Sequence, residues 1–455
     1  MSEYQLRSGN PADNSRLPVC DIGVLQHSEK FYRLECISSI EAIEAIEADW
    51  RKLEQSDDEP FTYFQSYNWC YDWCVKQYKN NPGHGIAQAK IYALWCDARL
   101  LMLWPMMAKR SYFGIKVLTF LTEPLGQYGN ILVDRTQVPL ELGPQIWKLI
   151  CRDAEVDAIT INQYPSTSSL DELLGDVGIA EQSSKAISFL DLSQFESWDE
   201  HHKSLSASAR KQRNRRRNKL AKAGVVDYEV IPGGSPRYAR LVDKALQMKQ
   251  IWLQQTGRRA DILSKRCTAS FLTGLSGKAG SNERPAGSFA HALTLNGEPI
   301  AIEIGMVEGD HYYSYLGAFD WKWRDYSPGK IQIELAQKWA KEAGLRTFDF
   351  LGDPSEYKSQ WTNSTRSLNS RSVPRSLLGW LYCVVWKAYL RGAVRTAYHH
   401  LGSERRKLLL KLLGLGARQN TATPKAGSLL RHSKTGIDAK ILCAAGYAIA
   451  ELFIL

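Results

Sequence analysis

The sequence predicts an α/β (α+β) fold built from two similar units, each a mixed, mostly antiparallel sheet flanked by helices. One observation is a pattern of strand, turn, strand, strand, helix and strand that occurs twice, at a spacing of about 200 residues. The other is size, because 455 residues are too many for one compact core and a hydrophobic share of 44% is ample for burying two. We therefore expect a duplicated unit.

The first copy opens with a strand at residues 31–37 and a helix at 40–53, whose apolar side chains recur at helical spacing. A second helix, which Ser66 can cap, carries Trp69 and Trp73. The repeated pattern follows as strands at 89–96, 100–107 and 115–121, a helix near 140–152 and a strand at 158–162.

The second copy is indicated by Asn296-Gly297, a dipeptide typical of two-residue hairpin turns. A further turn at Glu308-Gly309 separates the next two strands. A helix then begins near Pro328 and ends before Gly344, which suits a helix C-cap. The expected strands are 289–295, 299–307, 311–319 and 347–351.

The patterns divide the chain into four parts: a loose polar leader (1–30), a first unit (31–190), a second unit with the candidate site (191–372) and a C-terminal extension (373–455). The extension starts with a strongly apolar helix at 377–390 and continues into a basic stretch. Residues 375–416 can lie in a membrane interface, or they can cover an exposed face of the second unit. Both interpretations stay open.

Composition restricts the partners and the compartment. A net charge of +10 favours anionic partners, namely phosphorylated ligands, RNA or an acidic membrane surface. The nine cysteines are scattered without a C-x-x-C pair, which fits a reducing cytoplasm, and Cys70 and Cys74 are expected to be buried thiols rather than metal ligands. No signal peptide and no run of roughly 18 apolar residues is visible. We expect a cytoplasmic protein, with a peripheral position at the inner face of the membrane as the alternative.

The start of the helix at Ser327-Pro328-Gly329-Lys330 is a candidate anion site. Ser327 suits the N-cap and Pro328 the first helical position. Gly329 leaves the first-turn amides uncovered, and Lys330 places a cation where it opposes the helix dipole. Such a helix start can bind a phosphate. The alternative is an ordinary proline-started helix with a solvated lysine.

A strongly basic helix is predicted at 207–223, between the two copies. Its cations surround the helix and repel one another unless anions are present, so it is a candidate for phosphate or RNA contact. The alternative is a solvated basic helix that pairs with acidic loops. The cations are Arg210, Lys211, Arg213, Arg215, Arg216, Arg217, Lys219 and Lys222.

Two carboxylates interrupt predicted strands and are candidate general bases. Asp349 points to the face opposite Phe348 and Phe350, and Glu303 shares its face with small residues. The alternative is that each lies on the solvated side of its strand. Lys358, after the last strand, can meet phosphates or a developing oxyanion. No histidine has partners at metal-ligand spacing, and we expect no metal.

These motifs resemble the two-domain CelD-like and Fem-like branch of the GNAT superfamily. The similarity covers about residues 31–365 and rests on three segments: Phe64-x-Ser66-x-x-Trp69-x-x-x-Trp73, the Arg-rich helix from Arg210 to Gly224, and Ser327-Pro328-Gly329 with Phe348-Asp349-Phe350-Leu351-Gly352-Asp353 and Tyr357-Lys358-x-x-Trp361. The resemblance implies acyl transfer, with the pyrophosphate of an acyl-CoA on the helix that starts at residues 327–330. These residues lack the family's usual Gln/Arg-x-x-Gly-x-Gly/Ala loop. In Fem-like members the donor is an aminoacyl-tRNA.

We therefore expect an acyltransferase that moves an acetyl group from acetyl-CoA to an amine or hydroxyl of a sugar, nucleotide-sugar or polysaccharide precursor. Asp349 or Glu303 would assist deprotonation and Lys358 would offset negative charge. Residues 327–330 would hold the donor, while Arg210, Arg213 and Arg216, with Tyr357 and Trp361, would contact the acceptor. The alternatives are a tRNA-dependent Fem-like transferase and a non-catalytic scaffold of a membrane-associated polysaccharide assembly.

Overall fold

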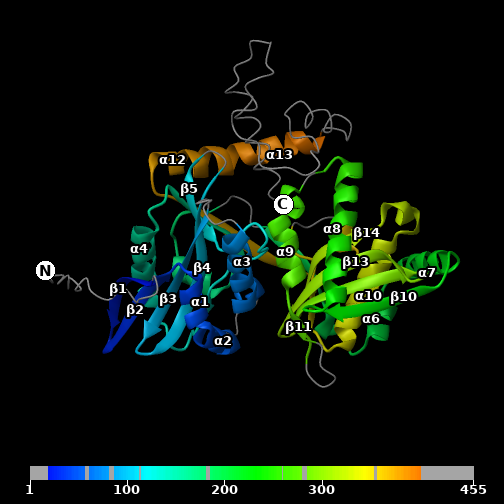
Figure 1. The fold of residues 1–455 in the computed structure, drawn as a ribbon, viewed down its shortest axis with the longest axis horizontal. Coiled ribbons are helices and arrows are strands. Elements are labelled where there is room, and N and C mark those ends of the chain that lie inside the picture. The colour runs from blue at the N-terminus through cyan, green and yellow to red at the C-terminus, as the bar shows by residue number, and fades with distance from the viewer. Residues whose placement is uncertain are drawn as a thin grey trace, which may run out of the picture.

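The computed structural model describes residues 19–56, 61–80, 87–111, 114–180, 185–258, 260–278, 284–352 and 356–400. One continuous mixed sheet runs through them in the strand order β1-β2-β3-β4-β5-β7-β16-β9-β15-β14-β13-β12-β10. Figure 1 shows the first half in blue and cyan beside the second half in green and yellow. The predicted fold class, a duplicated α/β unit with mostly antiparallel sheets, is confirmed.

The first half follows the predicted order. Strand β5 and strand β7 run parallel, with Val117 beside Ala158, and helix α4 makes the crossover between them. All the other neighbouring strands of this half are antiparallel. The elements are β2 Lys30–Ile37, α3 Tyr67–Asn80, β3 Ala87–Cys96, β4 Arg99–Arg110, β5 Lys116–Phe120, α4 Gly143–Ala154 and β7 Ala158–Pro165.

The second half repeats this layout. Strands β12, β13 and β14 form an antiparallel meander, helix α10 crosses over, and strand β15 returns parallel to β14. The hairpin at Asn296-Gly297 has positive φ at both residues, which its turn type requires. The elements are β10 Val226–Pro232, α8 Pro236–Thr256, α9 Arg266–Gly274, β12 Ala286–Leu295, β13 Glu298–Glu308, β14 His311–Phe319, α10 Pro328–Glu342 and β15 Thr347–Asp349.

Two central strands join the halves through main-chain hydrogen bonds. Strand β9, Lys185–Asp191, pairs with β15 of the second half. Strand β16, Ser364–Pro374, lies between β9 and β7, so it pairs with the first half although it follows the second in sequence. Each half therefore contributes one strand that pairs with a strand of the other half. The elements outside these layouts are β6 Leu132–Val133, α5 Ser169–Leu174, β8 Ile179–Ala180, α6 Trp198–Ser204, α7 Ala207–Ala221, β11 Gly277–Lys278 and α11 Glu356–Ser359.

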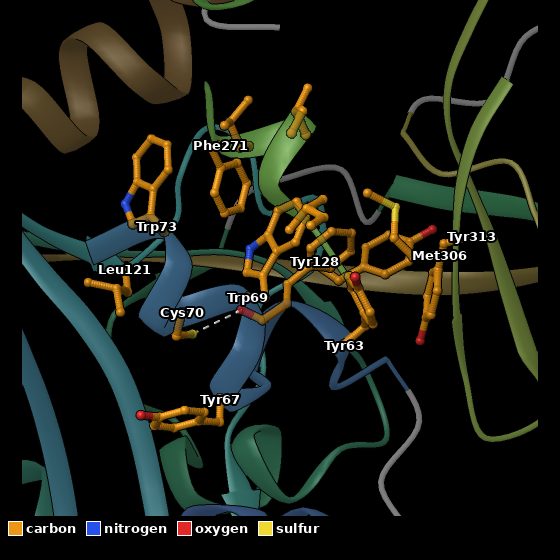
Figure 2. Close-up of a cluster of buried hydrophobic side chains, with 14 of the residues drawn as sticks. Tyr63, Tyr67, Trp69, Cys70, Trp73, Leu121, Tyr128, Phe271, Met306 and Tyr313 are labelled. Atoms are coloured by element: carbon orange, nitrogen blue, oxygen red, sulfur yellow. Dashed lines mark hydrogen bonds between the residues drawn. The ribbon is translucent and has the colours of Figure 1, made fainter. Parts of the chain in front are cut away.

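A shared aromatic core also joins the halves. In Figure 2, Trp69 and Trp73 of α3 point toward Phe271 of α9. The ring centroid of Trp69 lies 4.7 Å from that of Phe271, and that of Trp73 lies 5.5 Å from it, both in edge-on geometry. Cys70 is fully buried and lies 3.5 Å from the carbonyl oxygen of Phe64. The prediction that Cys70 and Cys74 are buried is confirmed.

Two predictions for the first half are wrong in part. The leader was expected to be loose to residue 30, but strand β1, Val19–His27, pairs antiparallel with β2. Its polar residues do not prevent pairing, because an edge strand keeps one side in solvent. The single helix at 40–53 is two helices, α1 Ile40–Ala45 and α2 Glu47–Ser56, separated at Ile46. Residues 1–18 lie outside the described part.

The apolar helix of the extension is present. It comprises α12 (Leu377–Trp380), a π-helical segment (Leu381–Leu390) and α13 (Arg391–His400). Residues 401–455, which include the rest of the expected basic stretch, lie outside the described part. Within the described residues, no helix is long and apolar enough to cross a membrane.

Candidate active site

Strands β14 and β15 separate after a short pairing. Only His311–Tyr313 of β14 pair with β15, whereas Ser314 and Leu316–Phe319 pair with β13 alone among the described strands. The ladder shifts register where Ile304 pairs with Leu316 and Gly305 with Ser314, so Tyr315 is a bulge that bends β14. In the first half only Thr119 and Phe120 of β5 extend beyond the parallel pairing. A long unpaired strand edge is therefore a feature of the second half.

Glu303 lies beside this edge. It is directly opposite Gly317 in the ladder, so both face the same side of the sheet. Gly317 is exposed, and apart from its chain neighbours no atom of the described residues lies within 4 Å of the position that a Cβ would occupy. The carboxyl of Glu303 is 2% exposed, so it does not lie on a solvated side of β13. A ligand that fills the space over Gly317 would reach a buried carboxyl.

The surroundings of Glu303 favour its neutral form. Burial raises the pKa of Glu303 to about 7, against a smaller lowering by hydrogen bonds from Tyr312 and Ser314. The hydroxyl of Tyr312 donates to Oε1 at 2.9 Å. A carboxyl that titrates near neutral pH suits a general base, because it is both ionised in part and basic enough to take a proton.

His291 lies behind Glu303, as its direct partner on β12. Its Nδ1 lies 2.7 Å from the hydroxyl of Tyr228, and burial lowers the pKa of His291 to about 3. The ring is therefore neutral and adds no positive charge that would lower the pKa of the carboxyl. The sequence pattern does not predict this contact, because the strand of Tyr228 was not expected.

Asp349 has a different environment and does not meet Glu303. Its carboxylate accepts the Tyr128 hydroxyl at 2.9 Å and the main-chain N–H of Leu351 at 2.7 Å, and it is fully buried. It points away from the face of Phe348 and Phe350, as predicted. Leu351 adopts a left-handed φ of 52°, a conformation that costs energy for a residue with a Cβ. Asp349 therefore holds this turn, and its role as a base stays a prediction.

Two lysines donate to main-chain carbonyls near the separated strands, one in β14 and one just after β15. Lys358 donates to the carbonyl of Leu351, and Lys249 of α8 donates to the carbonyl of Gly317 at 3.2 Å. Burial, Arg258 and Lys358 together lower the pKa of Lys249 to about 8. Lys249 is absent from the sequence prediction because α8 was not predicted, although Ser235-Pro236 is a clear helix start.

The start of α10 is open and cationic, but its cap differs from the prediction. Ser327 is left-handed, with φ of 53°, and its side chain makes no capping hydrogen bond, so the predicted cap is wrong. Pro328 does occupy the first turn. A Cβ on Gly329 would meet only Phe319, at 3.6 Å. Burial lowers the pKa of Lys330, and Arg216 lowers it further, so these two cations lie together.

The other basic residues of α7 divide into two groups. Arg213 is buried with its guanidinium 4.2 Å from the ring centroid of Trp361, and Trp361 is itself buried. Arg210 donates to the carbonyls of Lys203 and Leu205. The structure therefore brings only Arg216, of the three predicted arginines, to the start of α10. The exposed cations are Lys211, Arg215, Arg217, Lys219 and Lys222.

Tyr357, a predicted acceptor residue, lies near enough to Glu303 to feel its charge. It is 48% exposed, and burial and the nearby Glu303 raise the pKa of its hydroxyl. Asp353, the end of the predicted segment, lies outside the described residues. In the described ranges, no three His, Cys, Asp or Glu side chains are grouped so as to hold a metal ion.

Comparison with known proteins identifies this arrangement. Residues 207–359 match the family model described as the acetyltransferase (GNAT) domain. These residues, in the second half of the chain, form a GNAT domain. The match supports acyltransferase activity. No curated protein sequence matches the chain.

Solved structures extend the similarity to both halves. The chain is 12% identical to FemX, with a TM-score of 0.50 over 73% of this chain and 97% of that one. The C-terminal domain of a putative lysylphosphatidylglycerol synthetase from Agrobacterium fabrum gives 12% identity and a TM-score of 0.43 over 73% and 92%. A tandem GNAT protein from the clavulanic acid biosynthesis pathway is 10% identical, with a TM-score of 0.42 over 75% of this chain and 98% of that one. The match to FemX shows a two-unit, Fem-like fold.

Proposed function

We propose that the GNAT domain transfers an acyl group, in the first instance acetyl, from acyl-CoA to an amine or hydroxyl of a sugar, nucleotide-sugar or polysaccharide precursor. The observation that carries this proposal is the juxtaposition of Glu303 and Gly317. A buried carboxyl with a pKa of about 7 lies opposite a glycine with open space above it, at a strand edge that pairs with no other described strand.

The proposed reaction is direct transfer. Glu303 accepts a proton as the acceptor nitrogen or oxygen attacks the thioester carbonyl carbon. The carbonyl electrons move to oxygen, and main-chain N–H groups of the β14 edge, together with Lys249 and Lys358, offset the negative charge. The C–S bond then breaks, CoA leaves as a thiolate that takes up a proton, and the acceptor carries the acyl group. No covalent enzyme intermediate is required.

The start of α10 would hold the donor phosphates. Gly329 leaves the first turn accessible, and Lys330 and Arg216 add positive charge at the same place. Lys330 and Arg216 repel each other, and Glu334 of α10 already offsets part of the charge of Arg216. A pyrophosphate would relieve the remaining repulsion and would bind favourably here. These side chains would substitute for the glycine-rich loop that the sequence lacks.

The test is release of the CoA thiol from acetyl-CoA in the presence of amino sugars and nucleotide sugars. E303Q should lower kcat by about 10²-fold or more, because a general base contributes that much. E298Q, an exposed Glu on the same strand, is the control and should retain activity. Equal activity of E303Q and the parent protein would exclude Glu303 as the base.

A second candidate is a Fem-like transferase that uses an aminoacyl-tRNA. It is favoured by the five exposed cations of α7, beside the start of α10, and by the FemX-like fold. RNA that copurifies with the protein, and an affinity for charged tRNA that falls steeply with salt, would support it. A K211Q/R215Q variant should then lose tRNA affinity and keep any affinity for acetyl-CoA.

A further inference from the structure

The helical segment after β16 exposes an unusual amount of apolar surface. Fourteen large hydrophobic side chains are exposed among the described residues, and seven of them lie between residues 377 and 390. We call these seven the outer face: Leu377, Leu378, Trp380, Leu381, Val385, Tyr389 and Leu390. So many exposed apolar side chains on one helical segment indicate an interaction site. Figure 1 shows the segment, in orange, along one side of the molecule.

The opposite side of the segment is firmly attached to the sheet. Cys383 and Trp386 are buried, and a Cβ on Gly379 would lie 1.6 Å from the carbonyl oxygen of Asp157, so only glycine permits this approach. Lys387 donates to Asn162 at 3.0 Å and to Ser372 at 3.1 Å. The outer face is therefore displayed in a fixed orientation, while the helix uses its other side for packing.

The charges around the outer face indicate what kind of partner it can bind. Residues 375–400 contain no Asp or Glu, but they contain four cations, Arg375, Lys387, Arg391 and Arg395. Lys387 is engaged on the inner side, whereas Arg375 is exposed before the outer face and Arg391 follows it. A second copy of this face would bring like charges together. An apolar surface bordered by cations is instead complementary to a bilayer with anionic headgroups.

We propose that the outer face is a docking surface for an anionic lipid bilayer. The segment would lie in the plane of the interface, with Leu378, Trp380 and Tyr389 among the acyl chains and Arg375 and Arg391 at the headgroups. This inference is independent of the proposed acyl transfer, because none of these side chains belongs to the candidate active site.

The test is cosedimentation of the full-length protein with vesicles. Vesicles of phosphatidylcholine mixed equally with phosphatidylglycerol should bind on the order of tenfold more protein than pure phosphatidylcholine vesicles. L378E should lose binding to the mixed vesicles. The control is V225E, which also replaces an exposed apolar side chain with Glu, in the second half, and should bind like the parent protein. Y389E is a second variant on the outer face, in case L378E fails to fold.

Three results would overturn the proposal. One is no binding to the mixed vesicles, and another is equal binding by the parent, L378E and Y389E. The third is a dimer of the parent protein in size-exclusion chromatography that L378E converts to a monomer, since this would assign the outer face to a second copy of the chain. Loss of acyl transfer without loss of vesicle binding would affect the proposed function alone.

Discussion

Replacing Glu303 with Gln keeps the size of the side chain and an acceptor for the Tyr312 hydroxyl, but it removes the ability to ionise. Burial raises the pKa of Glu303 from its ordinary value of 4.5 to about 7. A shift of that size corresponds to about 3 kcal/mol of differential interaction between the two protonation states. Because the folded state prefers the protonated form, the ionised form destabilises folding by up to that amount.

The sign of the pH dependence follows from the two pKa values. Well below pH 4.5 the carboxyl is protonated in both the folded and the unfolded chain, so it contributes no difference. Between 4.5 and 7 the unfolded chain loses the proton while the folded protein keeps it, so stability falls as pH rises. Above 7 the full cost is reached. E303Q lacks this loss. The free energy of unfolding of E303Q minus that of the parent should therefore be about 3 kcal/mol larger at alkaline pH than at acid pH.

Two measurements check this prediction. Urea unfolding of the parent and E303Q at about pH 4.5 and about pH 8.5 should show the difference in the free energy of unfolding grow between the two conditions. In parallel, kcat/KM of the parent should rise about tenfold between about pH 6 and about pH 8 as Glu303 ionises. A difference that is the same at both pH values would refute the assigned environment of Glu303. E298Q, exposed on the same strand, should show no such growth.

Three further predictions concern the halves and the open edge. Y128F removes the hydroxyl that donates to buried Asp349 and should lower the free energy of unfolding by about 1–3 kcal/mol, measured by urea denaturation. W69A empties the contact with Phe271 between the halves and should cost about 3–5 kcal/mol in the same assay. G317V fills the space over the strand edge, where a Cβ has no close neighbour among the described residues, so thiol release should be lost while the melting temperature stays within a few degrees.

Each of these has a result that contradicts it. Y389F changes an exposed tyrosine and should leave the unfolding curve unchanged. An equal effect of Y389F and Y128F would mean that the hydrogen bond from Tyr128 to Asp349 does not stabilise the fold. A W69A protein as stable as the parent would mean that the aromatic core does not hold the halves together. Full activity of G317V would move the acyl donor away from the edge of β14.

The repeated strands and the helix starts are accessible from the sequence because their signals are local. Asn296-Gly297 predicts its hairpin through a turn that needs positive φ, and Pro328 marks the first turn of α10. The central strands β9 and β16 are not accessible in this way. Ser364–Pro374 is mostly polar and becomes a strand because β7 and β9 lie on either side of it.

The candidate site is predictable only in part, because most of its contacts join segments that are far apart in the sequence. Glu303 stands out as a carboxylate among apolar residues of one strand, but its burial and the neutral His291 beside it depend on pairing between strands. Tyr128 and Asp349 are 221 residues apart in the chain, and no local pattern relates them. Lys249 depends on the placement of α8 against the separated strands.

The most direct test of the central claim is calorimetric titration of acetyl-CoA into the parent protein, G329D and G329N. A side chain at Gly329 meets only Phe319, so both variants should fold, and they differ only in charge. We expect the parent and G329N to bind acetyl-CoA, whereas G329D should lose at least about tenfold in affinity because its carboxylate lies where a phosphate should lie. No binding by the parent, or equal binding by G329D and G329N, would contradict the placement of an acyl-CoA donor at the start of α10.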